Sequence, residues 1–341
     1  MLKEMGVKIR FFNYLNLKYD KLSNVVGIDY KIGSDLIRNY GYINTTKNRT
    51  KLLISFFKKL KRNVDCLILF DNKASTNIQF ELLPYIDYYY KRQLLKEKSL
   101  YTKILSGNRV YTDYYARTYN LDDDIEDDTE QGKIFYPKYK HKISLAWSIN
   151  FCINRFYKKS SYTLYALSKI IHIKYHKPNL NRKFVLAANF SVKYPSLPFF
   201  QREQMLKILQ EQFKTNNNVS IGFVPRKIYS ENLKASKAVL SPFGWGETCY
   251  RDYETFMSGS ALIKPDMNHL ETWPNLYKKD VTYLPISWKI EDFSEELSNA
   301  MENEKLLFRI AKNGQEAFKK LWTKKGRKIF CERFIEMLKQ S

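Results

Sequence analysis

The chain has 341 residues, of which 44% are hydrophobic, and this is enough apolar material for one large or two ordinary globular domains. A disordered chain is therefore excluded as the default. Lysine and arginine number 58 against 35 acidic residues, a formal charge of +23, which favours phosphate-rich molecules or anionic membrane surfaces as partners.

Cysteine usage and the distribution of apolar residues set the expected compartment. The four cysteines are far apart and have no paired spacing of the kind found in disulfide frameworks or zinc knuckles: Cys66, Cys152, Cys249 and Cys331. Residues 1–20 lack the continuous apolar run of a signal peptide, and no later stretch approaches the roughly 20 apolar residues of a membrane span. We expect a cytoplasmic protein, either soluble or peripheral on a membrane.

The first half of the chain contains two predicted strands, Val7–Phe12 and Cys66–Phe70, each rich in β-branched or aromatic residues. Tyr85–Tyr90 is a third candidate. Between the first two, Lys51–Arg62 has apolar residues at helical spacing and a basic edge. This basic helix could rest on an anionic leaflet, as could Lys319–Lys328, but we favour core-packing helices with solvated basic edges.

The segment Leu121–Glu130 holds seven acidic residues and is predicted to be a solvated loop. Asp122 and Asp124 form an Asp-x-Asp pattern that can hold a diphosphate through Mg²⁺ or Mn²⁺. Because so acidic a run makes such a match nearly inevitable, we discount it. His172 and His176 have metal-ligand spacing, but neighbouring lysines repel a cation and no third ligand is obvious, so no metal site is expected.

The stretch His176–Arg182 combines Pro, Asn and charge, as a linker does, and predicts a domain boundary. Beyond it, strands and helices alternate in a regular rhythm, which predicts crossover units and a parallel sheet. The expected elements are strand Phe184–Ala188, helix Phe199–Phe213, strand Val219–Val224, helix Ser230–Ser236, strand Ala238–Ser241, helix Thr248–Ser258 and strand Ala261–Lys264.

The segment with the clearest chemical signature is Ala238–Asn275. A short strand of buried type passes through a turn containing Gly244 and Gly246 into a helix whose first turn is expected to hold Glu247 and Thr248. Glycines let the backbone approach a ligand closely, and the free amides of a helix start suit phosphate. In open α/β sheets, ligands bind beyond the carboxyl ends of strands, where this turn falls.

Glu247, Arg251, Glu254 and Ser258 share one predicted helix stripe because they are three or four residues apart. Such a polar face could direct carboxylates at sugar or ribose hydroxyls. The alternative is a surface ladder of Glu–Arg–Glu pairs that contributes about 0.2–0.5 kcal/mol per pair. Spacing alone leaves both interpretations open.

The pattern SPFGWGETCYRDYETFMSGSALIKPDMNHLETWPNLY resembles the donor-binding element of GT-B glycosyltransferases, and in particular a bacterial and viral branch known as group 1 or exostosin-like. The resemblance implies two facing Rossmann-like domains with an interdomain cleft. It also implies that Glu254 holds the ribose of a nucleotide and that Glu247 touches the transferred sugar. The amides of residues 244–247 would face the donor.

One feature departs from the family pattern. Glu247 and Glu254 enclose six residues, one fewer than is typical of retaining members, so the resemblance does not set the stereochemical outcome.

Several cations are candidates for phosphate contacts. Arg251 would neutralise a diphosphate or pair with the two glutamates, and Lys264 would face the crevice or be solvated at its strand end. Ser241 belongs to the same donor-binding set. Lys193 and Arg202 follow the first strand of the second half, roughly where related enzymes place cationic contacts.

The catalytic base is not identified by the sequence. Asp266 and His269 follow a strand end and could meet the sugar, but a lone loop histidine is usually structural. Asp71 ends a strand of the first half, where an acceptor-side base could sit, although a strand-end Asp more often caps the following turn.

Together these observations predict an α/β protein with an acceptor-side domain at residues 1–180 and a donor-binding domain at 181–325. The final helix, Lys328–Lys339, within residues 326–341, is expected to return to the first domain. The predicted activity is metal-independent glycosyl transfer from a nucleotide-sugar to a hydroxyl of a glycan or lipid-linked acceptor, without a resident cofactor. Two rival interpretations remain. One is a basic protein that binds single-stranded nucleic acid, although no known nucleic-acid module is visible and no such partner is expected. The other is a non-catalytic sugar binder.

Overall fold

The computed structural model describes residues 2, 4–8, 25–29, 36, 46–122, 130–148, 173–192 and 196–339 of the chain. Its helices are α2 (Thr46–Lys61), α3 (Val110–Tyr119), α4 (Glu130–Tyr139), α7 (Phe200–Gln212), α8 (Arg226–Ala235), α9 (Tyr250–Ser258), α10 (Phe293–Glu302), α11 (Glu304–Lys320) and α12 (Lys324–Lys339). Short 3₁₀ turns occupy η3 (Phe80–Tyr85), η4 (Lys98–Thr102), η5 (Ser106–Asn108), η6 (Lys140–Lys142) and η7 (Leu197–Phe199).

The first half is built on a four-stranded parallel sheet of order β1-β2-β3-β5. Its strands are β1 (Val25–Asp29), β2 (Cys66–Asp71), β3 (Tyr88–Lys91) and β5 (Ile143–Leu145). The central strand β2 is apolar from Cys66 to Phe70, because helices and loops cover a parallel sheet on both faces. Leu53, Phe57 and Leu60 of α2 are fully buried, so the apolar face of this basic helix lies in the core, as predicted.

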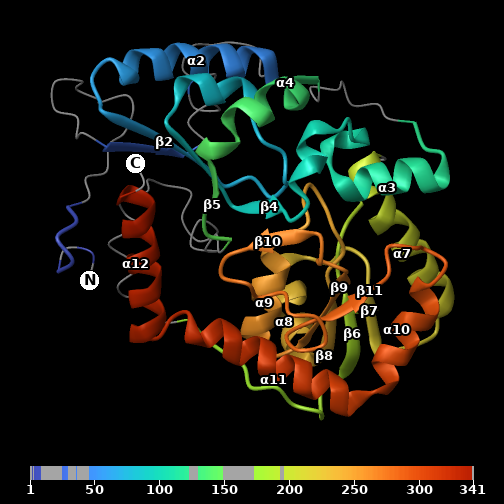
Figure 1. Cartoon of the computed structure of the whole chain (residues 1–341). Coiled ribbons are helices and arrows are strands. Elements are labelled where there is room, and N and C mark those ends of the chain that lie inside the picture. The colour runs from blue at the N-terminus through green and yellow to red at the C-terminus, as the bar shows by residue number, and fades with distance from the viewer. Residues whose placement is uncertain are drawn as a thin grey trace.

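The second half contains a five-stranded parallel sheet of order β11-β9-β8-β6-β7. Its strands are β6 (Phe184–Ala188), β7 (Val219–Ile221), β8 (Ser236–Leu240), β9 (Ala261–Pro265) and β11 (Leu284–Ile286). The chain alternates strand and helix from β6 to β9, which is the predicted crossover rhythm. The predicted α/β class with two parallel, Rossmann-like sheets is therefore confirmed. Figure 1 shows the two halves stacked one above the other.

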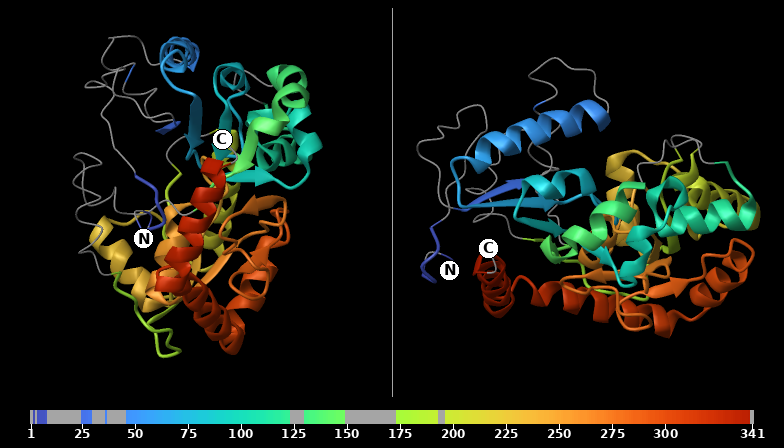
Figure 2. Two further views of the ribbon diagram at one scale, coloured as in Figure 1. Left: turned by 60° about the vertical axis from the view of Figure 1, so that its left-hand side comes forward. Right: turned by 45° about the horizontal axis from the view of Figure 1, so that its top comes forward.

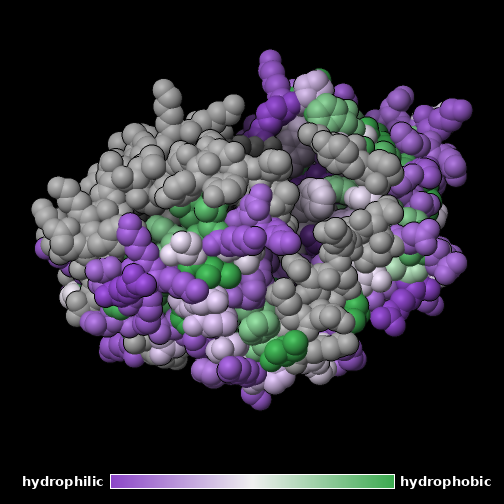
Figure 3. All heavy atoms as spheres, turned by 90° about the horizontal axis from the view of Figure 1, so that it is seen from above, coloured by the Kyte–Doolittle hydropathy of each residue, from purple (hydrophilic) through white to green (hydrophobic). Residues whose placement is uncertain are grey.

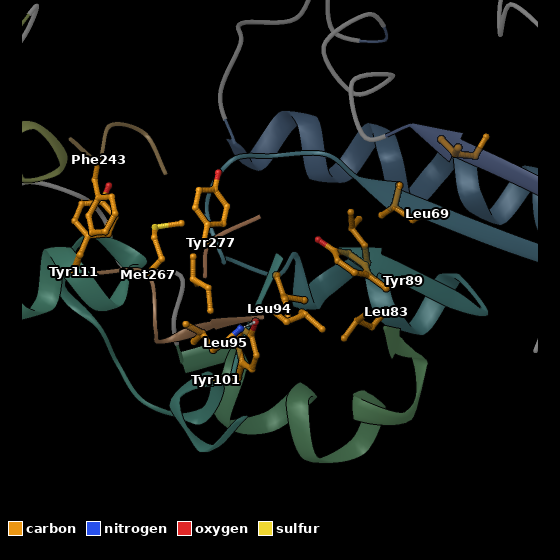
Figure 4. Close-up of a cluster of buried hydrophobic side chains, with 14 of the residues drawn as sticks. Leu69, Leu83, Tyr89, Leu94, Leu95, Tyr101, Tyr111, Phe243, Met267 and Tyr277 are labelled. Atoms are coloured by element: carbon orange, nitrogen blue, oxygen red, sulfur yellow. Dashed lines mark hydrogen bonds between the residues drawn. The ribbon is translucent and has the colours of Figure 1, made fainter. Parts of the chain in front are cut away.

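A short antiparallel ribbon joins the halves. Its strands are β4 (Gln93–Leu95) from the first half and β10 (Leu270–Thr272) from the second. Buried side chains on both sides of this ribbon belong to one cluster. Figure 4 shows the cluster running from Leu69 and Leu83 past Leu94 to Tyr277 and Phe243. The interface between the halves is thus a packed core.

The last helix, α12, lies against the first sheet, although it follows the second half in sequence (Figure 2). The hydroxyl of Tyr90 in β3 donates to the carbonyl of Met337 at 2.8 Å, and Nη2 of Arg333 donates to the carbonyl of Leu145 at 2.8 Å. Trp147 packs edge-on against Phe330 at 5.4 Å between ring centroids. These contacts bury one face of α12 on the first half.

Some predicted boundaries are wrong, for physical reasons. The strand expected at Tyr85–Tyr90 begins at Tyr88, because η3 occupies the preceding residues. The helix expected from Ser230 begins at Arg226, directly after Pro225. Of the strand expected at Val7–Phe12, residues 9–12 lie outside the described residues, and residues 7 and 8 are not part of a strand.

The surface seen from above is largely hydrophilic where the structure describes it, and hydrophobic residues form small separate groups (Figure 3). Within the described part of the chain, no helix has the length and apolar character needed to cross a membrane.

Candidate active site

A cavity of about 580 Å³ opens at the carboxyl ends of β6 and β7, beside the start of α9. The carboxyl ends of neighbouring parallel strands meet at one edge of a sheet, and this edge is where α/β proteins bind their ligands. The lining residues come from those strand ends and from α7, α8 and α9: Asn189, Phe190, Ser191, Arg202, Phe223, Val224, Arg226, Tyr229, Cys249, Tyr250, Arg251 and Glu254.

Arg251 lies on the first turn of α9 and reaches into this cavity. Its Nη2 donates to the carbonyl of Asn189 at 3.3 Å, and its guanidinium lies over the ring of Phe190 at 5.7 Å. Its Nε and Nη1 atoms are buried and have no hydrogen-bond partner among the described residues. Buried donors without acceptors are costly, so this guanidinium is poised to bind an anion.

Arg202, from α7, brings a second guanidinium to the same cavity. Its Nε donates to the carbonyl of Phe243 at 2.5 Å. Burial lowers the pKa of Arg202 to about 10, and repulsion by the charge of Arg251 adds to the effect. Gly244 makes room for this side chain, because a Cβ atom there would lie 2.5 Å from Nη2 of Arg202. Two cations that repel each other in one cavity favour a multiply charged anion between them.

Glu254 supplies a carboxylate one turn further along α9. It accepts a hydrogen bond of 2.6 Å from the hydroxyl of Tyr229, and its Oε1 lies 3.8 Å from Nη2 of Arg226. Burial raises the pKa of Tyr229 to about 12, so this phenol remains a donor. The cavity therefore presents a fixed carboxylate together with three arginines, Arg202, Arg226 and Arg251. The alternative was a surface ladder in which Arg251 pairs with Glu247 and Glu254. The contacts differ from it: Arg251 contacts Asn189 and Phe190, and Glu254 contacts Tyr229 and Arg226.

The glycine-rich turn between β8 and α9 lies at the boundary of the two halves. A Cβ atom at Gly246 would overlap the carbonyl of Ala74 and the amide of Ser75 in the first half. The Gly244 amide donates to the carbonyl of Gly246 at 3.1 Å, and the Tyr111 hydroxyl donates to the carbonyl of Gly244. The expectation that all amides of this turn face a donor is thus wrong for Gly244, whose amide is used within the turn.

The start of α9 also differs from prediction. The helix begins at Tyr250, and Cys249 is its N-cap, because the Asp252 carboxylate accepts a hydrogen bond from the Cys249 amide at 3.1 Å. Glu247 therefore precedes the helix and does not share the stripe of Arg251 and Glu254. At the other end, Gly259 adopts a φ of 68°, the left-handed cap that favours glycine.

Glu247 is fully buried between the halves and does not line the cavity. Its Oε2 accepts a hydrogen bond from Nε2 of Gln93 at 2.7 Å, and its Oε1 lies 3.6 Å from Nε2 of His269. Neither that oxygen nor either ring nitrogen of His269 has a hydrogen-bond partner among the described residues. The structure thus brings Glu247 and His269 together as an incompletely bonded polar pair.

Ser241 and Lys264 do not reach the cavity, because both belong to a buried network around Asp252. The Ser241 hydroxyl donates to Asp252 at 2.6 Å, and Nζ of Lys264 lies 3.3 Å from the same carboxylate. Burial opposes ionisation of Asp252, but Lys264 and the hydrogen bonds outweigh it and hold its pKa below the usual value. The expectation of a solvated Lys264 is wrong, since its side chain has 0% exposure.

Several other candidates lie elsewhere. Lys193, Asp124 and His172 fall outside the described residues. Asp71 is buried, pairs with Lys91 at 2.8 Å and accepts from the amide of residue 73 at 2.9 Å, so it does cap the turn. Asp266 accepts from the Asn268 amide at 2.6 Å. Among the residues that the structure covers, no group of three or more His, Cys, Asp or Glu side chains could hold a metal ion.

Three residues of the site were not predicted from the sequence. Gln93 ties the halves together: its amide nitrogen donates to the carbonyl of Ala74 and to Glu247, and its oxygen accepts from Thr248. Tyr229 fixes Glu254. Asp252 could have been found, because an acid at the third helical position after an N-cap is the mark of a capping box.

No protein-family model matches the chain, and no curated protein matches it. Solved structures do. HepE from Anabaena in complex with UDP-glucose has a TM-score of 0.47 at 10% identity and covers 91% of this chain and 82% of its own. WaaG, a glycosyltransferase involved in lipopolysaccharide biosynthesis, has a TM-score of 0.40 at 12% identity, covering 81% and 80%.

The C-terminal domain of a group 1 glycosyl transferase, LpcC from Francisella tularensis, has a TM-score of 0.31 at 13% identity and covers 45% of this chain and 97% of its own. Likeness at this level leaves the function to be argued from the site residues.

Proposed function

We propose that this chain is a glycosyltransferase that binds a nucleotide-sugar in the cavity of α9 and transfers the sugar to a hydroxyl of a glycan or lipid-linked acceptor. One observation carries the proposal: two guanidinium groups, of Arg202 and Arg251, face the same cavity as the carboxylate of Glu254 at the carboxyl edge of a parallel sheet. Cations suit a diphosphate, and a carboxylate suits the hydroxyls of a ribose.

In the proposed reaction, the bond between the anomeric carbon and the diphosphate oxygen breaks, and the acceptor oxygen forms the new bond to that carbon and loses its proton. The departing diphosphate gains negative charge, which Arg202 and Arg251 would neutralise. Charge stabilisation of this kind by fixed groups is a large term in catalysis. We propose that no metal ion is needed for it. Glu247 is proposed to contact the transferred sugar from the interdomain side.

The proposed cellular location rests on the state of the cysteine thiols. Cys66, Cys249 and Cys331 are free, which is in keeping with a reducing compartment, and we propose a cytoplasmic location. Association with an anionic membrane surface remains a proposal drawn from the excess of basic residues.

The test is a thermal-shift panel of UDP-, GDP-, dTDP-, ADP- and CMP-sugars with the parent protein and Glu254→Ala. We expect one nucleotide class to stabilise the parent and to lose most of that effect in the variant. Equal stabilisation of both proteins would remove the ribose assignment. No stabilisation of the parent by any of them would overturn the proposed function.

A further inference from the structure

A second cavity, of about 280 Å³, borders the glycine-rich turn at Trp245. Its walls come from the first half, apart from Trp245, which the turn contributes. Trp245 is 58% exposed and packs edge-on against Phe199 at 5.1 Å between ring centroids. Arg109 binds the same turn, since its Nε donates to the carbonyl of Trp245 at 3.0 Å.

The position of this cavity relative to the donor cavity suits a second substrate. Gly244 contacts Arg202 on the donor side, and Trp245 closes the second cavity on the other side. Glu247 follows this turn directly and is linked through Gln93 to the carbonyl of Ala74, the residue after Lys73 in the second cavity. The same short turn therefore borders both cavities.

The charge of the second cavity is strongly one-sided. Its lining includes four cationic side chains and one carboxylate, that of Glu81, which accepts a hydrogen bond of 3.0 Å from Thr50. The cations are Arg49, Lys73, Lys103 and Arg109. Burial lowers the pKa of Lys73, the carboxylates of Asp71 and Glu81 offset part of that effect, and Arg49 and Arg109 add to it. Crowded, partly desolvated cations of this kind are stabilised by an anion.

The rest of the lining suits a sugar ring. Phe80, Tyr101 and Trp245 present aromatic faces and edges, and Thr76, Asn77 and Gln79 add polar groups. Pockets with aromatic walls and a few convergent polar groups are typical of small-molecule sites.

We infer that this second cavity binds the acceptor, and that the acceptor is a sugar carrying an anionic group, either a phosphate or a carboxylate. The inference rests on the proposed function, because it takes the first cavity as the donor site. Beyond that function, the inference states the chemical class of the acceptor that the second cavity binds.

The test measures binding of glucose-6-phosphate, glucuronate, methyl glucoside and inorganic phosphate to the full chain by calorimetry, with and without saturating nucleoside diphosphate. We expect one or both charged sugars to bind, methyl glucoside to bind at least about tenfold more weakly, and the nucleotide not to displace them. Preference for one charged sugar assigns the anionic group. Equal binding of methyl glucoside, or of inorganic phosphate alone, would overturn the inference, as would displacement by the nucleotide.

Variants separate the two cavities. Lys73→Met and the exposed Lys103→Met are expected to weaken the charged sugar about tenfold and to leave nucleotide binding unchanged. Lys319→Met, which removes one charge from a half-buried lysine of α11, is the matched control and should change neither. If the Lys103 and Lys73 variants both bind the charged sugar normally, the inference fails while the proposed function stands. If the parent binds the charged sugar and no nucleotide, the proposed function fails instead.

Discussion

Oε1 of Glu247 lies 3.6 Å from Nε2 of His269, and neither atom has a hydrogen-bond partner in the described structure. A buried carboxylate in this state costs stability, because one oxygen has lost water without gaining a donor. Proteins retain such costs mainly where the group is needed for function. We therefore expect Glu247 to lower the stability of the fold and to be needed for activity.

Glu247→Gln tests this expectation. The Gln oxygen can still accept from Gln93, and its amide nitrogen replaces the oxygen that has no donor and can donate to Nε2 of His269, so we expect the free energy of unfolding to rise by about 1 kcal/mol. Transfer should slow at least tenfold, about 1.4 kcal/mol, with nucleotide affinity unchanged. Urea unfolding measures the change in stability, and release of the nucleotide from a nucleotide-sugar measures the rate of transfer. The exposed Glu316→Gln is the control. A variant with parental turnover would exclude Glu247 from the reaction.

Arg251→Gln should weaken nucleoside diphosphate binding by at least tenfold, about 1.4 kcal/mol, because its unpartnered Nε and Nη1 atoms are the proposed diphosphate donors. Calorimetry gives the dissociation constant. Arg309→Gln, on the exposed side of α11, makes the same chemical change away from both cavities and should bind normally. Similar affinities for the two variants would contradict the diphosphate assignment.

Gly246→Ala and Gly244→Ala are expected to act differently although they are two residues apart. A methyl group at Gly246 meets backbone of Ala74 and Ser75, which cannot move aside, so unfolding free energy should fall by about 1–3 kcal/mol. A methyl group at Gly244 meets the flexible end of Arg202, so stability should change less and nucleotide affinity should fall. Chemical denaturation and nucleotide titration of both variants decide this. The reverse pattern would contradict the contacts of Gly246 with the first half and of Gly244 with Arg202.

Lys264→Met leaves the Asp252 carboxylate buried without its cation, and we expect a loss of about 3–5 kcal/mol of unfolding free energy at neutral pH. In the parent, the depressed pKa of Asp252 gives stability that is present above its unfolded pKa and is lost as the pH falls through the folded pKa. The deficit of the variant should therefore shrink as the medium is acidified. Denaturant titrations over a pH series measure it. A pH-independent deficit would argue against this pairing.

The local sequence pattern was sufficient to predict most of the strands and helices of the second half. The strands Phe184–Ala188 and Ala261–Pro265 and the helix Phe200–Gln212 lie within a residue of prediction, because burial on both faces and helical periodicity are written into short windows of sequence. The strands β4 and β10 were missed, since each has only three residues and pairs with a segment far away in the chain.

The site was predictable only in part. Arg202, Arg251 and Glu254 do meet at one cavity, as expected for residues near strand ends and on one helix face. The burial of Lys264 and Glu247 could not be predicted, because it depends on partners such as Asp252 and Gln93 that tertiary packing brings in. The second cavity could not be predicted either, since its walls combine separate segments of the first half with Trp245.

The ribbon of β4 and β10 limits how far the two halves can move apart. Three residue pairs connect Gln93–Leu95 to Leu270–Thr272, and the packed cluster continues across them. A wide hinge motion would have to break that ribbon and expose the cluster to water, so we expect the two halves to move as one body. Under the proposed function, substrate entry and product exit therefore depend on local movements and not on a hinge between the halves.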